Sequence, residues 1–131
     1  MSTSRPAGAT WVALGALLAA IGVGAGALGA HALEARLEPD ALADYQTAVR
    51  YQLLHALALV AFGTWIEARE SRRGLRAPAV LFTLGTVLFS GSIYLLVFDL
   101  GSSWVWPATP LGGTLLLVAW IFWAYQAWRG R

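Results

Sequence analysis

The sequence predicts an all-α membrane protein, a four-helix transmembrane bundle with short loops that forms a single domain over residues 1–131. Hydrophobic residues make up 58% of the chain and charged residues only 12%, a balance outside the range of ordinary soluble domains. Four long uncharged blocks alternate with short charged connections. These connections leave no room for a separate soluble domain, so any functional site must lie within the bundle or at its rim.

The first, third and fourth uncharged blocks are long enough to cross a bilayer as helices, because about 20 residues at about 1.5 Å each span the hydrocarbon core, and the second is shorter. Arg50 and Glu67 bound the uncharged part of the second block, whose helix we expect to begin earlier, near Pro39. The four spans are expected at about residues 8–33, 45–67, 77–98 and 109–128.

Prolines define the later helices. Pro78 stands in the first turn of the third helix, where its missing N–H has no cost, and Asp99 follows that helix. The fourth helix is expected to start with Thr109 as N-cap and Pro110 as its first helical residue.

The arginines predict the orientation. One side of the membrane would carry the connection between spans two and three and both chain ends, with Arg5, Arg69, Arg72, Arg73, Arg76, Arg129 and Arg131. The opposite side holds Arg36 and Arg50 beside five acidic residues. The positive-inside rule therefore places both termini in the cytoplasm. We expect the protein in the inner (plasma) membrane.

A rival interpretation treats the first block as a cleaved signal peptide, since Ala30, His31 and Ala32 form a small-x-small pattern. The weakly positive start and the long apolar run disfavour it. Cleavage would leave the orientation of the other three spans unchanged.

Glycines predict where helices pack closely. Gly15, Gly22, Gly26 and Gly29 align along one face of the first span, with a GxxxG pair at Gly22 and Gly26. Packing within the four-helix unit is favoured over a dedicated dimerisation surface. Gly112 and Gly113 are expected to serve similarly in the fourth span.

Polar side chains form a stripe on two of the predicted helices. Asp44, Tyr51, Gln52 and His55 fall within about 100° of one another on the second helix, at 100° per residue. Thr83, Thr86, Ser90 and Tyr94 do so within about 80° on the third, and the topology brings His31 and Thr109 to the same side. The candidate outer-leaflet polar cluster comprises His31, Tyr51, Gln52, His55, Ser90, Ser92, Tyr94 and Thr109.

Two interpretations of this cluster remain. Its groups can hydrogen-bond across helices to fix the bundle, at about 1 kcal/mol per bond. They can instead line an outward-facing pocket for a headgroup, quinone-like molecule, ion or proton, since ionisable residues within membranes often mark sites.

Other classes of function find little support. The chain has no cysteine, and its two histidines lack the spacing of a metal-binding pair, so we predict no metal or cofactor. Ser90 and Ser92 lack the surroundings of a catalytic nucleophile, which predicts a protein that is not an enzyme. The net charge of +2 comes from arginines beside membrane segments, so no nucleic-acid partner is expected.

Four blocks resemble a known family: GALGAHAL at 26–33, YQTAVRYQLLHALAL at 45–59, LFSGSIYLL at 88–96 and ATPLGG at 108–113. They are similar to the small bacterial membrane proteins called domain of unknown function 423. The resemblance implies a four-span helical protein of a family with no assigned molecular activity. It marks as motif residues His31, Thr47, Tyr51, Gln52, His55, Ser90, Gly91, Ser92, Tyr94, Thr109, Pro110, Gly112 and Gly113.

The leading hypothesis is a non-enzymatic inner-membrane protein whose polar cluster either locks the bundle or holds a small amphipathic ligand such as a membrane lipid. The first alternative is an accessory or assembly subunit of a larger membrane complex, or a homo-oligomer. A third is a carrier of protons or small solutes, for which the chain offers few charged relay groups.

Overall fold

The computed structural model describes residues 7–69 and 76–129, without the side chains of residues 102 and 103, and it is all-helical over that part of the chain. Four helices are long and apolar enough to cross a membrane, which confirms the predicted fold class at this level. The elements are α1 (Ala9–Leu28), a π-helical turn η1 (Gly29–Leu33), α2 (Pro39–Glu67), α3 (Ala77–Val97), a short α4 (Ser102–Val105) and α5 (Ala108–Arg129).

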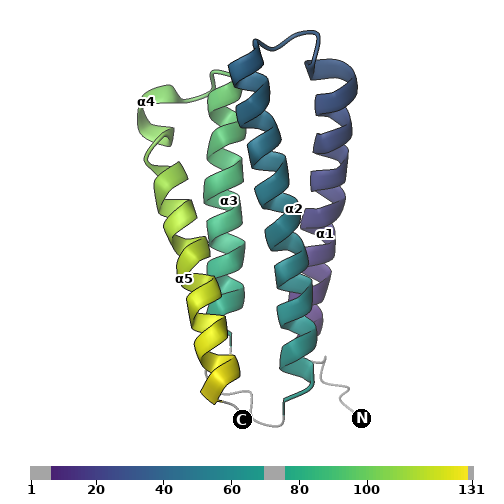
Figure 1. Ribbon diagram of the computed structural model, residues 1–131, viewed down its shortest axis with the longest axis vertical. Coiled ribbons are helices and arrows are strands. Elements are labelled where there is room, and N and C mark those ends of the chain that lie inside the picture. The colour runs from purple at the N-terminus through teal and green to yellow at the C-terminus, as the bar shows by residue number, and fades with distance from the viewer. Residues whose placement is uncertain (1–6, 70–75, 130–131) are drawn as a thin grey trace.

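The long helices stand side by side in the order α1, α2, α3, α5, with each antiparallel to its neighbour (Figure 1). Half of the most apolar window of α2 is buried, against 17% for α1 and for α5, so α2 is the central element. The start of α1 and the end of α5 lie at the same end of the molecule (Figure 1).

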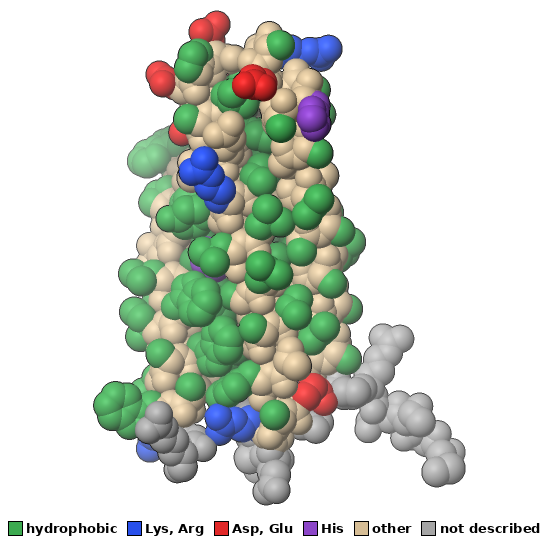
Figure 2. Space-filling view, turned by 45° about the vertical axis from the view of Figure 1, so that its right-hand side comes forward, with side chains coloured by type: hydrophobic (Ala, Val, Ile, Leu, Met, Phe, Trp, Pro, Cys, Tyr) green, Lys and Arg blue, Asp and Glu red, His purple; other side chains and the backbone are tan. Residues whose placement is uncertain are grey.

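Charges separate along the long axis. We call the end with the turns after η1 and α3 the acidic end, because it carries Glu34, Glu38, Asp40, Asp44 and Asp99. The opposite end, which we call the basic end, carries Arg69, Arg76 and Arg129. Figure 2 shows hydrophobic side chains covering the shaft between them. Exposed leucine, isoleucine and valine side chains along all four long helices suit a lipid environment.

Glycines at a seven-residue interval let α1 lie against α2. A Cβ on Gly15 would lie 2.7 Å from the carbonyl oxygen of Ala56, and one on Gly29 would lie 2.9 Å from the ring of Tyr45. Gly8 and Gly22 face α2 in the same way, so the series is Gly8, Gly15, Gly22 and Gly29. Gly26 packs less tightly, because a Cβ added there would lie 3.4 Å from the Val49 side chain. A Cβ on Gly24 would meet no atom within 4 Å.

A second close contact joins α3 to α5. A Cβ on Gly112 would come within 2.4 Å of the backbone nitrogen of Phe89, and one on Gly85 within 3.1 Å of the Gly112 carbonyl oxygen. A Cβ on Gly113 would lie 3.5 Å from the Phe89 ring, which is an ordinary van der Waals distance. Of the two predicted packing glycines in this helix, Gly112 therefore makes the tight contact.

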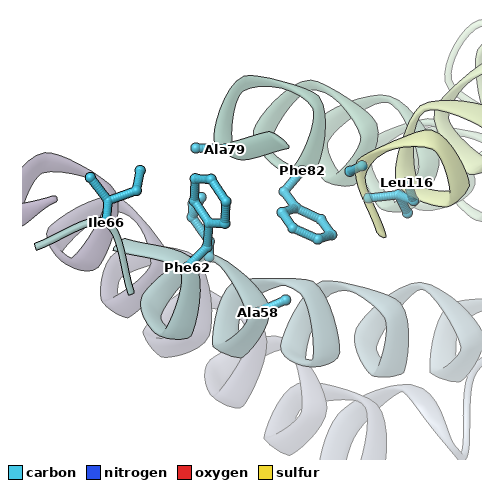
Figure 3. Close-up of a cluster of buried hydrophobic side chains, with 8 residues drawn as sticks. Ala58, Phe62, Ile66, Ala79, Phe82 and Leu116 are labelled. Atoms are coloured by element: carbon cyan, nitrogen blue, oxygen red, sulfur yellow. The ribbon is translucent and has the colours of Figure 1, made fainter. Parts of the chain in front are cut away.

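The apolar core lies between α2, α3 and α5, in the half of the bundle nearer the basic end. Phe62 of α2 and Phe82 of α3 lie between their two helices, and Leu116 of α5 approaches from the side (Figure 3). Ala58, Ile66 and Ala79 complete the labelled part of this cluster, and all six residues are at most 5% exposed. Close packing here sets the spacing of the helices that carry the polar cluster.

The predicted helix limits hold to within one residue at most ends, and α2 begins at Pro39 as expected. The start of α5 is different. The helix begins at Ala108, and the Thr109 hydroxyl lies 2.6 Å from Ser92 Oγ instead of capping its own helix. The turn η1 and the helix α4 were not foreseen; α4 follows a left-handed turn in which Asp99 has φ 58° and Gly101 has φ 89°.

Candidate functional site

Gln52 ties three helices together. Its side chain is 4% exposed and projects from the middle of α2. Its Nε2 donates a hydrogen bond to the Leu18 carbonyl oxygen of α1 at 2.9 Å, and its Oε1 accepts one from the Tyr94 hydroxyl of α3 at 2.9 Å. Both ends of the amide are therefore used inside the protein, as an apolar surrounding requires.

His55 joins α2 to α5. Its Nδ1 lies 2.7 Å from the Tyr51 carbonyl oxygen, and its Nε2 accepts a hydrogen bond from Trp120 Nε1 at 3.2 Å. Because a carbonyl oxygen only accepts and an indole N–H only donates, the imidazole is neutral with its proton on Nδ1. The ring is 3% exposed and packs beside Phe82 and Trp120.

Two more hydrogen bonds cross from α2 to its neighbours. Ser90 Oγ of α3 donates to the Ala48 carbonyl oxygen at 2.8 Å. The Tyr45 hydroxyl donates to the Ala25 carbonyl oxygen of α1 at 2.7 Å. With the Ser92–Thr109 contact between α3 and α5, these bonds complete what we call the polar network: Tyr45, Gln52, His55, Ser90, Ser92, Tyr94, Thr109 and Trp120.

Sequence reasoning missed Tyr45 and Trp120. Tyr45 lies seven residues before Gln52, so both are on the same side of α2, and its ring packs 5.3 Å from that of Tyr94. Trp120 lies well inside the predicted span rather than at its ends. The indole N–H of a tryptophan at that depth needs a hydrogen-bond acceptor, so the position of Trp120 in the sequence could have predicted that it joins the polar cluster.

Two predicted members lie outside the polar network. The expectation that His31 joins it is wrong, because the side chain is exposed beyond the end of α1, and α1 contributes backbone carbonyl groups instead. Tyr51 is 42% exposed and packs against Phe89, with ring centroids 4.5 Å apart and the rings tilted by 31°. Thr83 and Thr86 donate their hydroxyl hydrogen bonds to their own helix, at Ala79 and Phe82.

The network also reaches deeper than the outer half that the sequence suggested. Gln52 bonds to Leu18 and lies beside Gly22, at the middle of α1, and His55 lies one turn further from the acidic end. Ser92 and Thr109 mark the opposite limit of the network, near the acidic end. The polar side chains thus follow a path from one end of the bundle to its centre.

Two hollows flank the Ser92–Thr109 contact. One, which we call the Asp44 cavity, has a volume of about 430 Å³ and lies at the acidic end between α2, α3 and α5. Its lining consists of Ala41, Asp44, Ile93, Leu96, Val97 and Thr109. The other is an apolar groove of about 430 Å³ beside Gly91, walled by Trp104 and Val105. The Asp44 cavity combines a carboxylate and a hydroxyl with four apolar side chains, so it suits an amphipathic molecule.

The candidate metal ligands in the described part of the chain are His, Asp and Glu side chains. Residues 7–69 and 76–129 contain no group of three or more His, Asp or Glu side chains placed to hold a metal ion. A structural role for the polar network accounts for its geometry, since each of its members donates or accepts within the protein.

Comparison with known proteins agrees with the sequence resemblance. A family described as "Protein of unknown function (DUF423)" matches residues 25–113. A UPF0382 membrane protein of Haemophilus influenzae is 37% identical over 109 residues, which cover 83% of this chain and 86% of that protein. One of Staphylococcus haemolyticus is 38% identical over 115 residues, covering 85% of this chain and 88% of that protein.

The UPF0382 inner membrane protein YgdD of Escherichia coli is 36% identical over 98 residues, which cover 75% of this chain and 73% of that protein. No solved structure matches the chain. With a match over more than half its length and relatives above 30% identity, the chain belongs to the DUF423 family of membrane proteins.

Proposed function

We propose that this protein is a non-enzymatic inner-membrane protein that binds a membrane phospholipid in the Asp44 cavity, while the polar network holds the helices around that cavity. The observation that carries this proposal is the lining of the cavity, where the polar groups of Asp44 and Thr109 adjoin the apolar side chains of Ile93, Leu96 and Val97. A phospholipid offers the same combination of a polar headgroup and an apolar body.

The depth of the cavity supports a headgroup. Asp44 lies five residues from the start of α2, and Thr109 is the second residue of α5, so both belong to the last turns at the acidic end. Polar groups at that level meet the headgroup region rather than the hydrocarbon centre. The polar network, by contrast, has its donors and acceptors paired within the protein, which favours the structural interpretation for its deeper members.

The proposal includes an orientation with both termini in the cytoplasm, so that the acidic end faces outward. The described arginines of the basic end, Arg69, Arg76 and Arg129, support it through the positive-inside rule. Arg5, Arg72, Arg73 and Arg131, which also entered the sequence argument, lie outside the described residues.

A cavity-filling pair of variants tests lipid binding. Ala41 lines the Asp44 cavity, whereas Ala43 is an exposed alanine on the same helix. We expect Ala41→Phe to lose the phospholipid that co-purifies with the wild type after mild extraction, as measured by native mass spectrometry, and Ala43→Phe to retain it. Equal lipid content in the two folded variants would overturn the proposal.

Membership of a larger assembly is a second candidate. Only 17% of the most apolar windows of α1 and α5 is buried, which leaves two flanks of the bundle facing outward. The same native mass spectrum separates the candidates, because an accessory subunit or a homo-oligomer would appear at the mass of the complex, and a lipid-binding monomer at the mass of one chain plus lipid.

A further inference from the structure

Ser92 and Thr109 bring two hydroxyl groups together near the acidic end. Ser92 Oγ donates to the Phe89 carbonyl oxygen at 2.9 Å, and it also lies 2.6 Å from Thr109 Oγ1. A hydroxyl has one proton. Either hydroxyl could donate in the second contact, but the Phe89 carbonyl oxygen can only accept, so we assign the Ser92 proton to Phe89 and the Thr109 hydroxyl as the donor to Ser92.

This direction makes Thr109 an acceptor toward the Asp44 cavity. Its single proton points at Ser92, so its remaining capacity is the lone pairs of its oxygen. The other polar side chain of the lining is the Asp44 carboxylate, whose two oxygens accept hydrogen bonds and carry no proton to donate. Thr109 and Asp44 would therefore both accept hydrogen bonds from a bound ligand, and the carboxylate of Asp44 would also attract a positive charge.

The surroundings reinforce this preference. The acidic end carries Glu34, Glu38, Asp40 and Asp99 in addition to Asp44, against Arg36 and Arg50, so the local potential disfavours an anion. A phosphate bound directly against Asp44 would find no cationic side chain among the residues that line the cavity, so the phosphate of a headgroup must lie away from Asp44.

We propose that the Asp44 cavity selects a phospholipid by the primary ammonium group of its headgroup, which donates hydrogen bonds to Asp44 and Thr109. This inference rests on the proposed function and names its ligand class. A primary ammonium has three N–H donors, whereas a trimethylammonium group has the same charge and none, so a phosphatidylethanolamine is favoured over a phosphatidylcholine with the same acyl chains. The apolar part of the lining, Ile93, Leu96 and Val97, favours the lipid over a free amine.

Binding of defined lipids to the delipidated full-length protein in detergent tests the selection. A hydrogen bond to a charged group contributes about 1.5–3 kcal/mol, so the wild type should bind phosphatidylethanolamine at least about tenfold more tightly than phosphatidylcholine. Thr109→Val removes the acceptor and should reduce this ratio, while Thr109→Ser restores it. Asp44→Ala removes the carboxylate acceptor and should also reduce this ratio, and Asp40→Ala is the matched control on the same helix, outside the cavity lining.

The outcomes distinguish this inference from the proposed function. Equal affinity of the wild type for the two lipids, with both lost in Ala41→Phe, would overturn amine selection and leave lipid binding in place. Lipid binding unchanged by Ala41→Phe would overturn both. Competition by soluble phosphoethanolamine as effective as that by the lipid would assign the site to a free amine and overturn the choice of a lipid.

Discussion

At the scale of single residues, the polar side chains of this protein serve mainly as joints between helices. Gln52 uses both of its polar atoms on neighbouring helices, at Leu18 of α1 and Tyr94 of α3. His55 uses Nε2 on Trp120 of α5 and Nδ1 on a carbonyl oxygen of its own helix. An unpaired group at this depth would cost several kcal/mol in hydrocarbon. The joints therefore fix which helix faces meet, even though each adds little net stability.

Replacing His55 tests this role. His55→Leu removes the acceptor of Trp120, and we expect it to lower the free energy of unfolding by about 1 kcal/mol, within the range of interhelical hydrogen bonds in membranes. A double-mutant cycle with Trp120→Phe should return a coupling of about 0.6 kcal/mol. The measurement is reversible unfolding in mixed detergent micelles.

The same variant bears on the binding site. Because His55 belongs to the network and not to the lining of the Asp44 cavity, His55→Leu should keep the lipid content of the wild type. A stable His55→Leu protein that loses its lipid would show that the deep part of the network, rather than the cavity, forms the binding site.

At the scale of elements, the glycine series of α1 brings the backbones of α1 and α2 together, as the polar network joins their side chains. The seven-residue interval keeps Gly8, Gly15, Gly22 and Gly29 on one face over the whole length of the helix. The backbone of α1 can then approach α2 closely enough for the Leu18 and Ala25 carbonyl oxygens to accept from Gln52 and Tyr45. Close packing and polar pairing therefore depend on each other.

Two glycines of α1 should respond to alanine in opposite ways. Gly15→Ala places a methyl group 2.7 Å from the Ala56 carbonyl oxygen, so the helices must separate, and we expect a loss of about 1–3 kcal/mol. Gly24→Ala meets no atom within 4 Å, so the gain in helix propensity should stabilise the protein by up to about 1 kcal/mol. Thermal unfolding in detergent measures both, and equal effects would contradict the assigned contact face.

The sequence predicted the elements better than their partners. Long uncharged blocks and prolines located the four helices, because span length and helix starts follow from local chemistry. The 100° rule also placed Gln52, His55, Ser90 and Tyr94 on the faces where the structure has their interhelical bonds. It could not show that His31 is exposed, because the π-helical turn η1, which buries Gly29 and Leu33 instead, was not part of the prediction.

At the scale of the whole molecule, one long apolar shaft separates two ends of different chemistry (Figure 2). The basic end carries the described arginines Arg69, Arg76 and Arg129, and the acidic end carries the Asp44 cavity. An ammonium-selecting site gains from the acidic surroundings, while the arginines favour the leaflet that is rich in anionic lipid. The orientation in the membrane therefore decides which leaflet supplies the ligand.

Reporter fusions decide the orientation. We expect a fluorescent protein fused to the C-terminus to be active in the cytoplasm, and alkaline phosphatase inserted at residues 100–104 to be active outside, because the arginine excess retains the basic end in the cytoplasm. The reciprocal fusions, with the two reporters exchanged, serve as controls and should be inactive. Phosphatase activity at the C-terminus would reverse the assignment. The Asp44 cavity would then open to the cytoplasmic leaflet, and its lipid would have to come from there.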